Sequence, residues 1–380
     1  SMRVLMVTTS YPDHPGSQRG IFIRELCLGL RDRGVEVMVL TPRVLAASPL
    51  LENDHGIVVR RFRYPSGGRQ LNQMDSIPVF AMVVYMASGF IKTIGAIRAF
   101  RPDVIHGNWI VPTGLIASLA GFVTGTPVIN TARGMDTRVR ENRLVRILFT
   151  RAVKLSDRLT VVSDAMRSIP GLEHAEVISS GIDPVFFDIT PAATSKTVLF
   201  ARSLEPVYDA ATLLRSVPLV LEKAAGVQFT IAGSGTQGER LRSLAHDLGV
   251  EDRVTFLGHV QHREIPSLAS RSRVFVSTAL ADGTSVALLE AMAAGLVPVV
   301  TDIEANRALV THGHDGYLFR PGDERDLAVY ILKALSGEIS APMLLQKKES
   351  LKERVSWSIV ADRYVRSYNR LTERHPGRDG

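Results

Sequence analysis

The sequence predicts an α/β protein of two domains, each built on a parallel sheet. Short apolar runs alternate with stretches of helical spacing in two series, the first starting at Val4 and the second at Val198. The length of 380 residues is too great for one typical domain and suits two. Between the series, Thr190 to Lys196 is rich in Ala, Thr and Ser and is the best linker candidate. We therefore expect domains at residues 1–190 and 191–355, followed by a final segment at 356–380.

The cysteine count and the N-terminus indicate a cytoplasmic protein. Cys27 is the single cysteine, which excludes an internal disulfide and any metal site built from several cysteines. Ser1 before Met2 resembles the remnant of a tag, and a strand follows directly, so we expect no signal peptide. Residues Ile77 to Ile91 form an apolar run before Lys92. A membrane-spanning helix needs about 20 such residues, so we expect a core helix here rather than an interfacial one.

The positive charge is concentrated in the first half. Residues 1–190 hold 22 Lys and Arg against 16 Asp and Glu, whereas residues 191–380 hold 23 against 22. One cluster has only Glu141 opposing it: Arg138, Arg140, Arg143, Arg146, Arg151 and Lys154. A solvated basic helix face explains the cluster, and contact with an anionic membrane or a phosphate-bearing acceptor explains it equally well. No nucleic-acid recognition motif accompanies the charge, so nucleic acid is not an expected partner.

The first half opens with a strand at Val4 to Thr8, a loop from Ser10 to Gly20 and an amphipathic helix. This opening contains no G-x-G-x-x-G, which argues against a nicotinamide dehydrogenase. Later strands end near His106 and at Thr131, and Arg133 follows the second of them.

The most informative stretch runs from Val274 to Asp302. A buried strand precedes a loop carrying Asp282, Gly283, Thr284 and Ser285. A helix from Val286 to Ala294 and a second strand complete the unit. Free backbone N–H groups and the helix dipole at the start of this helix form an anion site. The eight-residue spacing puts one carboxylate, Asp282, in the loop and the other, Glu290, on the helix.

This stretch resembles the signature of retaining GT-B glycosyltransferases of the family 4 type. The resemblance implies two Rossmann-like domains facing a central cleft, with the last helix crossing back to the N-terminal domain. It implies that Glu290 binds the donor ribose and that Asp282, a Glu in most relatives, lies beside the transferred sugar. The backbone of Gly283, Thr284, Ser285 and Val286 then holds the diphosphate.

The rest of the chain extends the resemblance. Arg202 matches a family arginine that binds the diphosphate, but the partner lysine five residues later is Val207 here. The remaining expected donor contacts are Gly20, Gly233, Gly235, His259 and Val260. On the acceptor side the resemblance points to His106, with Asn108 in place of a second His. Arg133 also replaces a family His, which fits an anionic acceptor but removes an imidazole base. A buried, structurally satisfied His106 is the competing interpretation.

The resemblance predicts a hexosyltransferase that transfers a sugar from a UDP-, GDP- or other nucleotide-diphosphate donor with retention of configuration. The expected acceptor is a hydroxyl of a glycan or lipid-linked intermediate, as in polysaccharide biosynthesis. No D-x-D pair occurs in the sequence, so we expect neither a metal nor another cofactor. The expected location is cytoplasmic, extending to peripheral binding at the inner membrane face. Two alternatives stay open: a GT-B nucleotide-sugar epimerase, and a non-catalytic subunit that binds nucleotide sugars.

Overall fold

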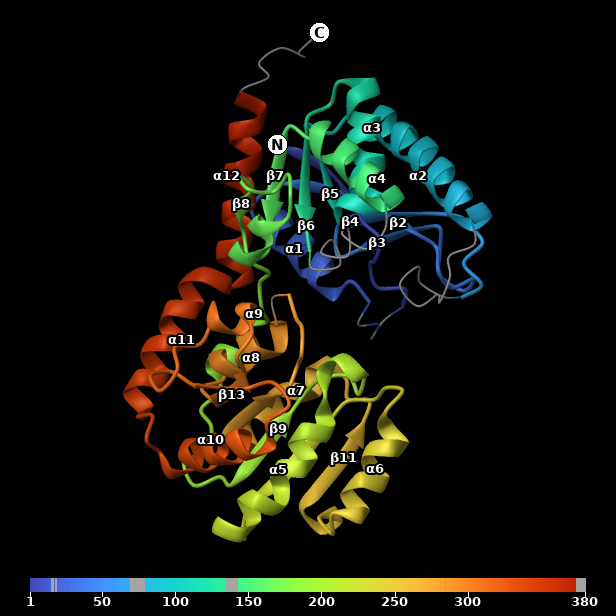
Figure 1. Ribbon diagram of the computed structural model, residues 1–380. Coiled ribbons are helices and arrows are strands. Elements are labelled where there is room, and N and C mark those ends of the chain that lie inside the picture. Colours follow the sequence, from blue (N-terminus) through green and yellow to red (C-terminus); the bar gives the residue numbers. More distant parts are fainter. Residues whose placement is uncertain (15–16, 18, 69–78, 134–142, 284, 374–380) are drawn as a thin grey trace. The chain divides into compact units, whose positions relative to one another are not determined.

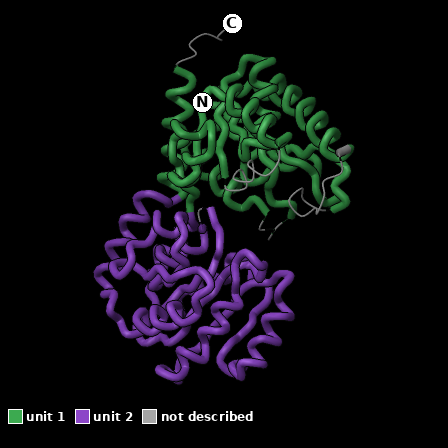
Figure 2. The backbone as a smooth tube through the Cα atoms, in the orientation of Figure 1, with its two compact units in different colours: residues 1–181, 357–380 green, residues 182–356 purple. Residues whose placement is uncertain are grey.

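The computed structural model describes residues 1–373 apart from 15–16, 18, 69–78, 134–142 and 284. The chain forms two compact units (Figure 2). Unit 1 comprises residues 1–181 and the segment that starts at Trp357, and unit 2 comprises residues 182–356. The division lies before the expected linker, because Ile182, Phe186 and Phe187 pack into the core of unit 2.

Unit 1 contains an eight-stranded sheet in the order β3-β4-β2-β1-β5-β6-β7-β8. All neighbouring strands are parallel except β3, which is antiparallel to β4. Its strands are β1 Arg3–Val7, β2 Glu36–Pro42, β3 Leu51–Asp54, β4 Ile57–Phe62, β5 Val104–Asn108, β6 Val128–Ala132, β7 Arg158–Val161 and β8 Glu176–Val177. Its α-helices are α1 Ile21–Arg31, α2 Val79–Phe100, α3 Leu115–Thr124, α4 Arg143–Lys154 and α12 Trp357–Glu373. Among its described residues, unit 1 also has two short helical turns, η2 Ile110–Gly114 and η4 Asp164–Ser168.

Successive side chains along β1 point to opposite faces of the sheet, so they show which helices cover each face. Val4 and Met6 pack in a core with α1 and α12. Leu5 and Val7 point to the opposite face and pack in a core with α2 and α3 (Figure 1). Helix α12 therefore belongs to unit 1, as the sequence predicted, and its Tyr368 is fully buried there.

Helix α2 is longer than the sequence suggested. The expected run ended before Lys92, but the helix continues to Phe100 because Lys92 and Arg98 are exposed and do not interrupt its buried face. Residues Phe80–Phe100 are long and apolar enough to cross a membrane, judged by length and composition. The prediction that the segment is too short was therefore wrong, and Ile77 lies outside the described residues.

Unit 2 contains a six-stranded parallel sheet in the order β11-β10-β9-β12-β13-β14. Its strands are β9 Thr197–Phe200, β10 Gln228–Ala232, β11 Val254–Gly258, β12 Val274–Ser277, β13 Val297–Thr301 and β14 Tyr317–Phe319. Its α-helices are α5 Ala210–Lys223, α6 Gly238–Asp247, α7 Ile265–Arg271, α8 Val286–Ala293, α9 Glu304–Arg307, α10 Glu324–Ser336 and α11 Ala341–Val355. Its short turns are η5 Pro184–Asp188, η6 Pro206–Tyr208, η7 Glu251–Arg253 and η8 His262–Glu264.

Helices cover both faces of this second sheet, as in unit 1. Val198 and Phe200 of β9 pack in a core with α5 and α10, whereas Leu199 points to the face covered by α8. Both units therefore have the doubly wound α/β architecture that the sequence predicted.

Candidate active site

The predicted strand–loop–helix–strand unit is present in unit 2 as β12, the following loop, α8 and β13. Ser285 starts the helix, because its side chain accepts a hydrogen bond from the backbone N–H of Leu288. Val286 is the first residue of α8. Thr284 lies outside the described residues. The backbone N–H of Gly283 donates to Oδ1 of Asp282 at 2.9 Å, so this amide already has a partner.

Arg202 lies at the start of α8 and is held from three sides. Its Nη1 donates to Oγ of Ser285 at 2.7 Å, and its Nη2 lies 2.7 Å from Oδ2 of Asp282. The guanidinium also stacks over the ring of Tyr208, 4.2 Å from the ring centre. The Arg202–Asp282 contact is an ion pair without hydrogen-bond alignment, because the buried Oδ2 accepts no hydrogen bond from a described residue. Arg202 is thus in contact with Asp282 and Ser285, and the resemblance assigned all three to the donor side of the site.

The position of the missing lysine has its own structural role. Val207 is 40% exposed, and its carbonyl accepts a hydrogen bond from the N–H of Leu280 at 2.8 Å. The carbonyl of Tyr208 accepts from Oγ1 of Thr278 at 2.6 Å. The η6 turn is therefore tied to the loop after β12, and the ring of Tyr208 supports Arg202.

Glu290 lies on α8 and is bound to a residue that the sequence analysis missed. Nε2 of His262 lies 2.6 Å from Oε1 of Glu290, whose side chain is 8% exposed. The imidazole ring also packs against Phe186, with ring centres 5.7 Å apart. His262 lies shortly after β11. In the sequence, the one hint of a role in the donor site was its position three residues after His259, which was itself an expected donor contact.

Two predicted glycines of unit 2 are required by close packing. A Cβ at Gly233 would lie 1.9 Å from the carbonyl oxygen of Arg202, and one at Gly235 would lie 2.5 Å from that of Leu204. The turn they form therefore packs against the segment that carries Arg202. His259 is exposed and Val260 is half-buried, both just after β11.

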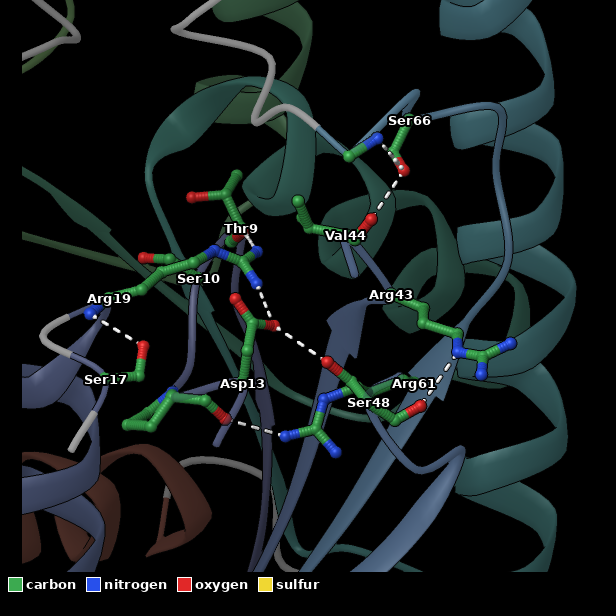
Figure 3. A network of polar contacts seen from close by, with 12 residues as sticks. Thr9, Ser10, Asp13, Ser17, Arg19, Arg43, Val44, Ser48, Arg61 and Ser66 are labelled. Carbon is green, nitrogen blue, oxygen red and sulfur yellow. Dashed lines mark hydrogen bonds and ion pairs between the residues drawn. The ribbon is translucent and has the colours of Figure 1, made fainter. Parts of the chain in front are cut away.

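The first loop of unit 1 is fixed by a buried polar network (Figure 3). Arg19 donates from Nη1 to Asp13 and from Nη2 to the carbonyl of Thr9, both at 2.7 Å. Gly20 immediately precedes α1 as its N-cap with a φ of 64°, and a Cβ there would lie 2.4 Å from the carbonyl oxygen of Ser10. Only glycine fits both constraints, and this accounts for its presence without a ligand.

His106 does not present a ring nitrogen to a substrate. It is fully buried on β5, with Nδ1 2.7 Å from the hydroxyl of Tyr368 and Nε2 2.7 Å from the hydroxyl of Thr131. Burial, and then the charge of Arg133, hold the pKa of His106 well below its usual range. The expectation of a catalytic role therefore gives way to the competing one, because Nδ1 is bonded to Tyr368 of α12 and Nε2 to Thr131 of β6.

Arg133 contacts Asn108, another position at which this chain departs from the family pattern. Its Nε donates to Oδ1 of Asn108 at 2.8 Å, and its Nη1 lies 3.4 Å from Oγ of Ser180. The guanidinium also lies over the ring of Phe22, 5.2 Å from its centre. The replacements at 108 and 133 are therefore in direct contact, with Ser180 beside them in unit 1.

The chain matches known proteins along nearly its whole length. Residues 182–354 match the model of glycosyl transferases group 1, and residues 20–169 match the glycosyl transferase 4-like domain. The glycogen synthase of Mycobacterium tuberculosis is 26% identical over 392 residues, covering 97% of this chain and 94% of that protein. The phosphatidyl-myo-inositol mannosyltransferase of Mycobacterium leprae is 26% identical over 373 residues, covering 97% and 96%.

Solved structures share the fold at lower identity. HepE of Anabaena in complex with UDP has a TM-score of 0.77 and 18% identity, covering 97% of this chain and 100% of that one. Sucrose-phosphate synthase from Thermosynechococcus elongatus has a TM-score of 0.75 and 18% identity, covering 98% and 100%. With both halves matched by family models, this chain belongs to the GT-B glycosyltransferases of the family 4 type.

Proposed function

We propose that this glycosyltransferase moves a sugar from a nucleoside-diphosphate donor to an acceptor hydroxyl with retention of anomeric configuration and without a metal ion. Its class and its use of nucleotide sugars follow from the family. The observation that carries the proposal is the placement of Arg202 at the start of α8 by Asp282, Ser285 and Tyr208. A fixed cation beside a helix N-terminus suits a diphosphate whose negative charge grows as the sugar leaves.

Arg202 has a partner in the absence of donor, and this bears on the mechanism. A bound diphosphate would compete with Asp282 for the N–H groups of the guanidinium and draw them away from the carboxylate. Released from Arg202, the Asp282 carboxylate can accept a hydrogen bond from a sugar hydroxyl. Neither the neutral, buried His106 nor the cationic Arg133 can act as a general base. This supports a mechanism in which the departing phosphate takes the proton of the acceptor hydroxyl.

The acceptor that fits best carries negative charge. Arg133 offers a guanidinium, held by Asn108, that can bind a carboxylate or phosphate. The proposed acceptor is a glycan or a lipid-linked intermediate bearing such a group, in the cytoplasm. One relative is named a glycogen synthase and another a phosphatidyl-myo-inositol mannosyltransferase, so acceptors of both kinds occur among proteins similar to this one.

A thermal-shift screen of UDP, GDP and ADP, followed by turnover of the matching sugar donors, tests the proposal. A nucleotide at 100 times its dissociation constant adds about 2.7 kcal/mol of stability. NMR of the glycosylated product then gives its anomeric configuration, and an inverted product would contradict retention. Binding without turnover would favour a non-catalytic subunit, and release of a C2-epimerised sugar would favour an epimerase.

A further inference from the structure

The three helices that cover one face of the unit 1 sheet carry an unusual charge. Helices α2, α3 and α4 contain 22, 10 and 12 residues and not one Asp or Glu. All six of their cations are exposed, and none forms an ion pair with a described carboxylate: Lys92, Arg98, Arg143, Arg146, Arg151 and Lys154. We call the outward side of these helices the basic–apolar face. It is positive throughout the described residues of its helices.

The same face exposes large apolar side chains. Eight of the sixteen exposed large hydrophobic residues in the described chain lie on these three helices. Phe122 is 74% exposed, Phe80 is 72% exposed and Ile91 is 65% exposed. The others are Val83, Leu119, Val123, Leu144 and Ile147. A concentration of this kind marks an interaction site rather than ordinary scatter.

Helix α2 lies along the unit rather than standing free of it. Tyr85 is fully buried on its inward side and makes edge-to-face contacts with Phe62 and Tyr64, each with ring centres 5.0 Å apart. At Gly89 a Cβ would lie 2.7 Å from the side chain of Ile116 on α3. About one third of the apolar window of α2 is buried in this way. One side of α2 is thus buried in the core of unit 1, and its opposite side is left to contact an external surface.

We propose that the basic–apolar face docks unit 1 on an anionic phospholipid bilayer. Cations and apolar side chains on one helical face suit the interface, where the former meet lipid phosphates and the latter enter the acyl boundary. A second copy of the chain is the other occupant to consider. A two-fold contact would bring six cations opposite six cations with no carboxylate on either set of helices, and such like-charge pairing disfavours it.

Vesicle sedimentation tests this docking without relying on catalysis. Wild-type protein is mixed with phosphatidylcholine vesicles, with and without phosphatidylglycerol, and binding to the anionic vesicles should be the tighter. A triple variant, Arg143→Glu, Arg151→Glu and Lys154→Glu, should lose at least about 100-fold in binding, since each cation near such a surface contributes about fivefold. The matched control is Lys223→Glu, Arg325→Glu and Lys352→Glu, three exposed positions of unit 2 with the same change in net charge.

An apolar pair completes the design. Ile91→Ser with Phe122→Ser should weaken binding even at high salt, where charges are screened within about 3 Å. Val329→Ser with Leu345→Ser, exposed on unit 2, should leave binding unchanged. Nucleotide-induced thermal stabilisation of each variant verifies that the protein is folded, and if a variant fails this check, the wild-type comparison of the two vesicle types decides. Equal binding to both vesicles, equal loss in the control variants, or a dimer that dissociates in the face variants would overturn the proposal.

Discussion

His262 donates from Nε2 to the carboxylate of Glu290 across 2.6 Å, and this contact fixes the side chain proposed to bind the donor ribose. The ring is itself held against Phe186. Glu290 is therefore oriented before donor arrives, which lowers the entropic cost of binding.

Glu290→Gln should weaken donor binding by tenfold or more. A hydrogen bond to a charged group is worth about 1.5–3 kcal/mol, and the neutral amide keeps the shape of the side chain but not its charge. Calorimetric titration with the nucleotide identified by the screen measures the effect. Glu222→Gln, an exposed position on α5, is the matched control. Unchanged affinity in Glu290→Gln would remove Glu290 from the donor site.

His262→Ala should raise KM for the donor about tenfold while leaving kcat nearly constant. The imidazole acts on Glu290 rather than on the reacting atoms, so its loss affects donor binding in the ground and transition states alike. His262→Gln, which retains an N–H donor, should recover part of the effect. His246→Ala, on the exposed surface of α6, is the control. A fall in kcat with constant KM would point to a direct role in the chemistry.

His106 should make the folded protein less stable in mild acid. Its pKa is depressed by burial, so the folded state stays neutral while an unfolded histidine binds a proton below about pH 6.5. Stability is therefore lost as the pH falls below that value, by up to about 1.4 kcal/mol per pH unit. Urea titrations at about pH 7.5 and about pH 5.5 measure this slope. His106→Gln should show a shallower slope, and an identical one would refute the assignment.

The local elements could be predicted because their signals are local. The apolar runs of β12 and β13 and the loop of small residues before α8 were enough to predict this strand–loop–helix–strand segment without information from the rest of the chain. The end of α2 could not be predicted from the same signals. Lys92 follows an apolar run and resembles a boundary, and only the packing of Tyr85 against Phe62 shows which side of the helix faces the core.

Pairings between distant residues could not be predicted. The choice between a catalytic and a buried His106 depends on Tyr368, 262 positions away. His262 stands in a polar turn with no periodicity to mark it, and its partner lies 28 positions later. The replacements Asn108 and Arg133 were recognised separately, but their hydrogen bond depends on the adjacency of β5 and β6.

Transfer activity should survive EDTA. The cation at the start of α8 is Arg202, and together with the helix dipole it can neutralise the leaving diphosphate without a bound metal. Initial rates measured with EDTA, with added Mg²⁺ and with added Mn²⁺ should agree within about twofold, far less than the loss from removing one stabilising group. Abolition by EDTA with recovery on adding either ion would show that a metal completes the site.

Arg202→Ala should lower turnover by about 10²–10³ and affect donor affinity less, because the diphosphate gains charge in the transition state. The family resemblance implies a second cation at the position of Val207, so Arg202 should carry a larger share of that stabilisation here. The substitution also leaves Asp282 buried without its cation. The double variant Arg202→Ala with Asp282→Asn separates the loss of the cation from the cost of an unpaired carboxylate. If donor affinity recovers in the double variant, the affinity lost in Arg202→Ala was caused by the unpaired carboxylate.

Val207→Lys tests whether a second positive charge near Arg202 helps to bind the donor diphosphate. The side chain is 40% exposed and the turn is held through backbone carbonyls, so a lysine can be accommodated without breaking those hydrogen bonds. It should raise donor affinity or partly restore the rate of Arg202→Ala. Arg325→Ala, exposed on α10, is the control for loss of one positive charge from unit 2. Wild-type turnover in Arg202→Ala would mean that the diphosphate is held by other residues.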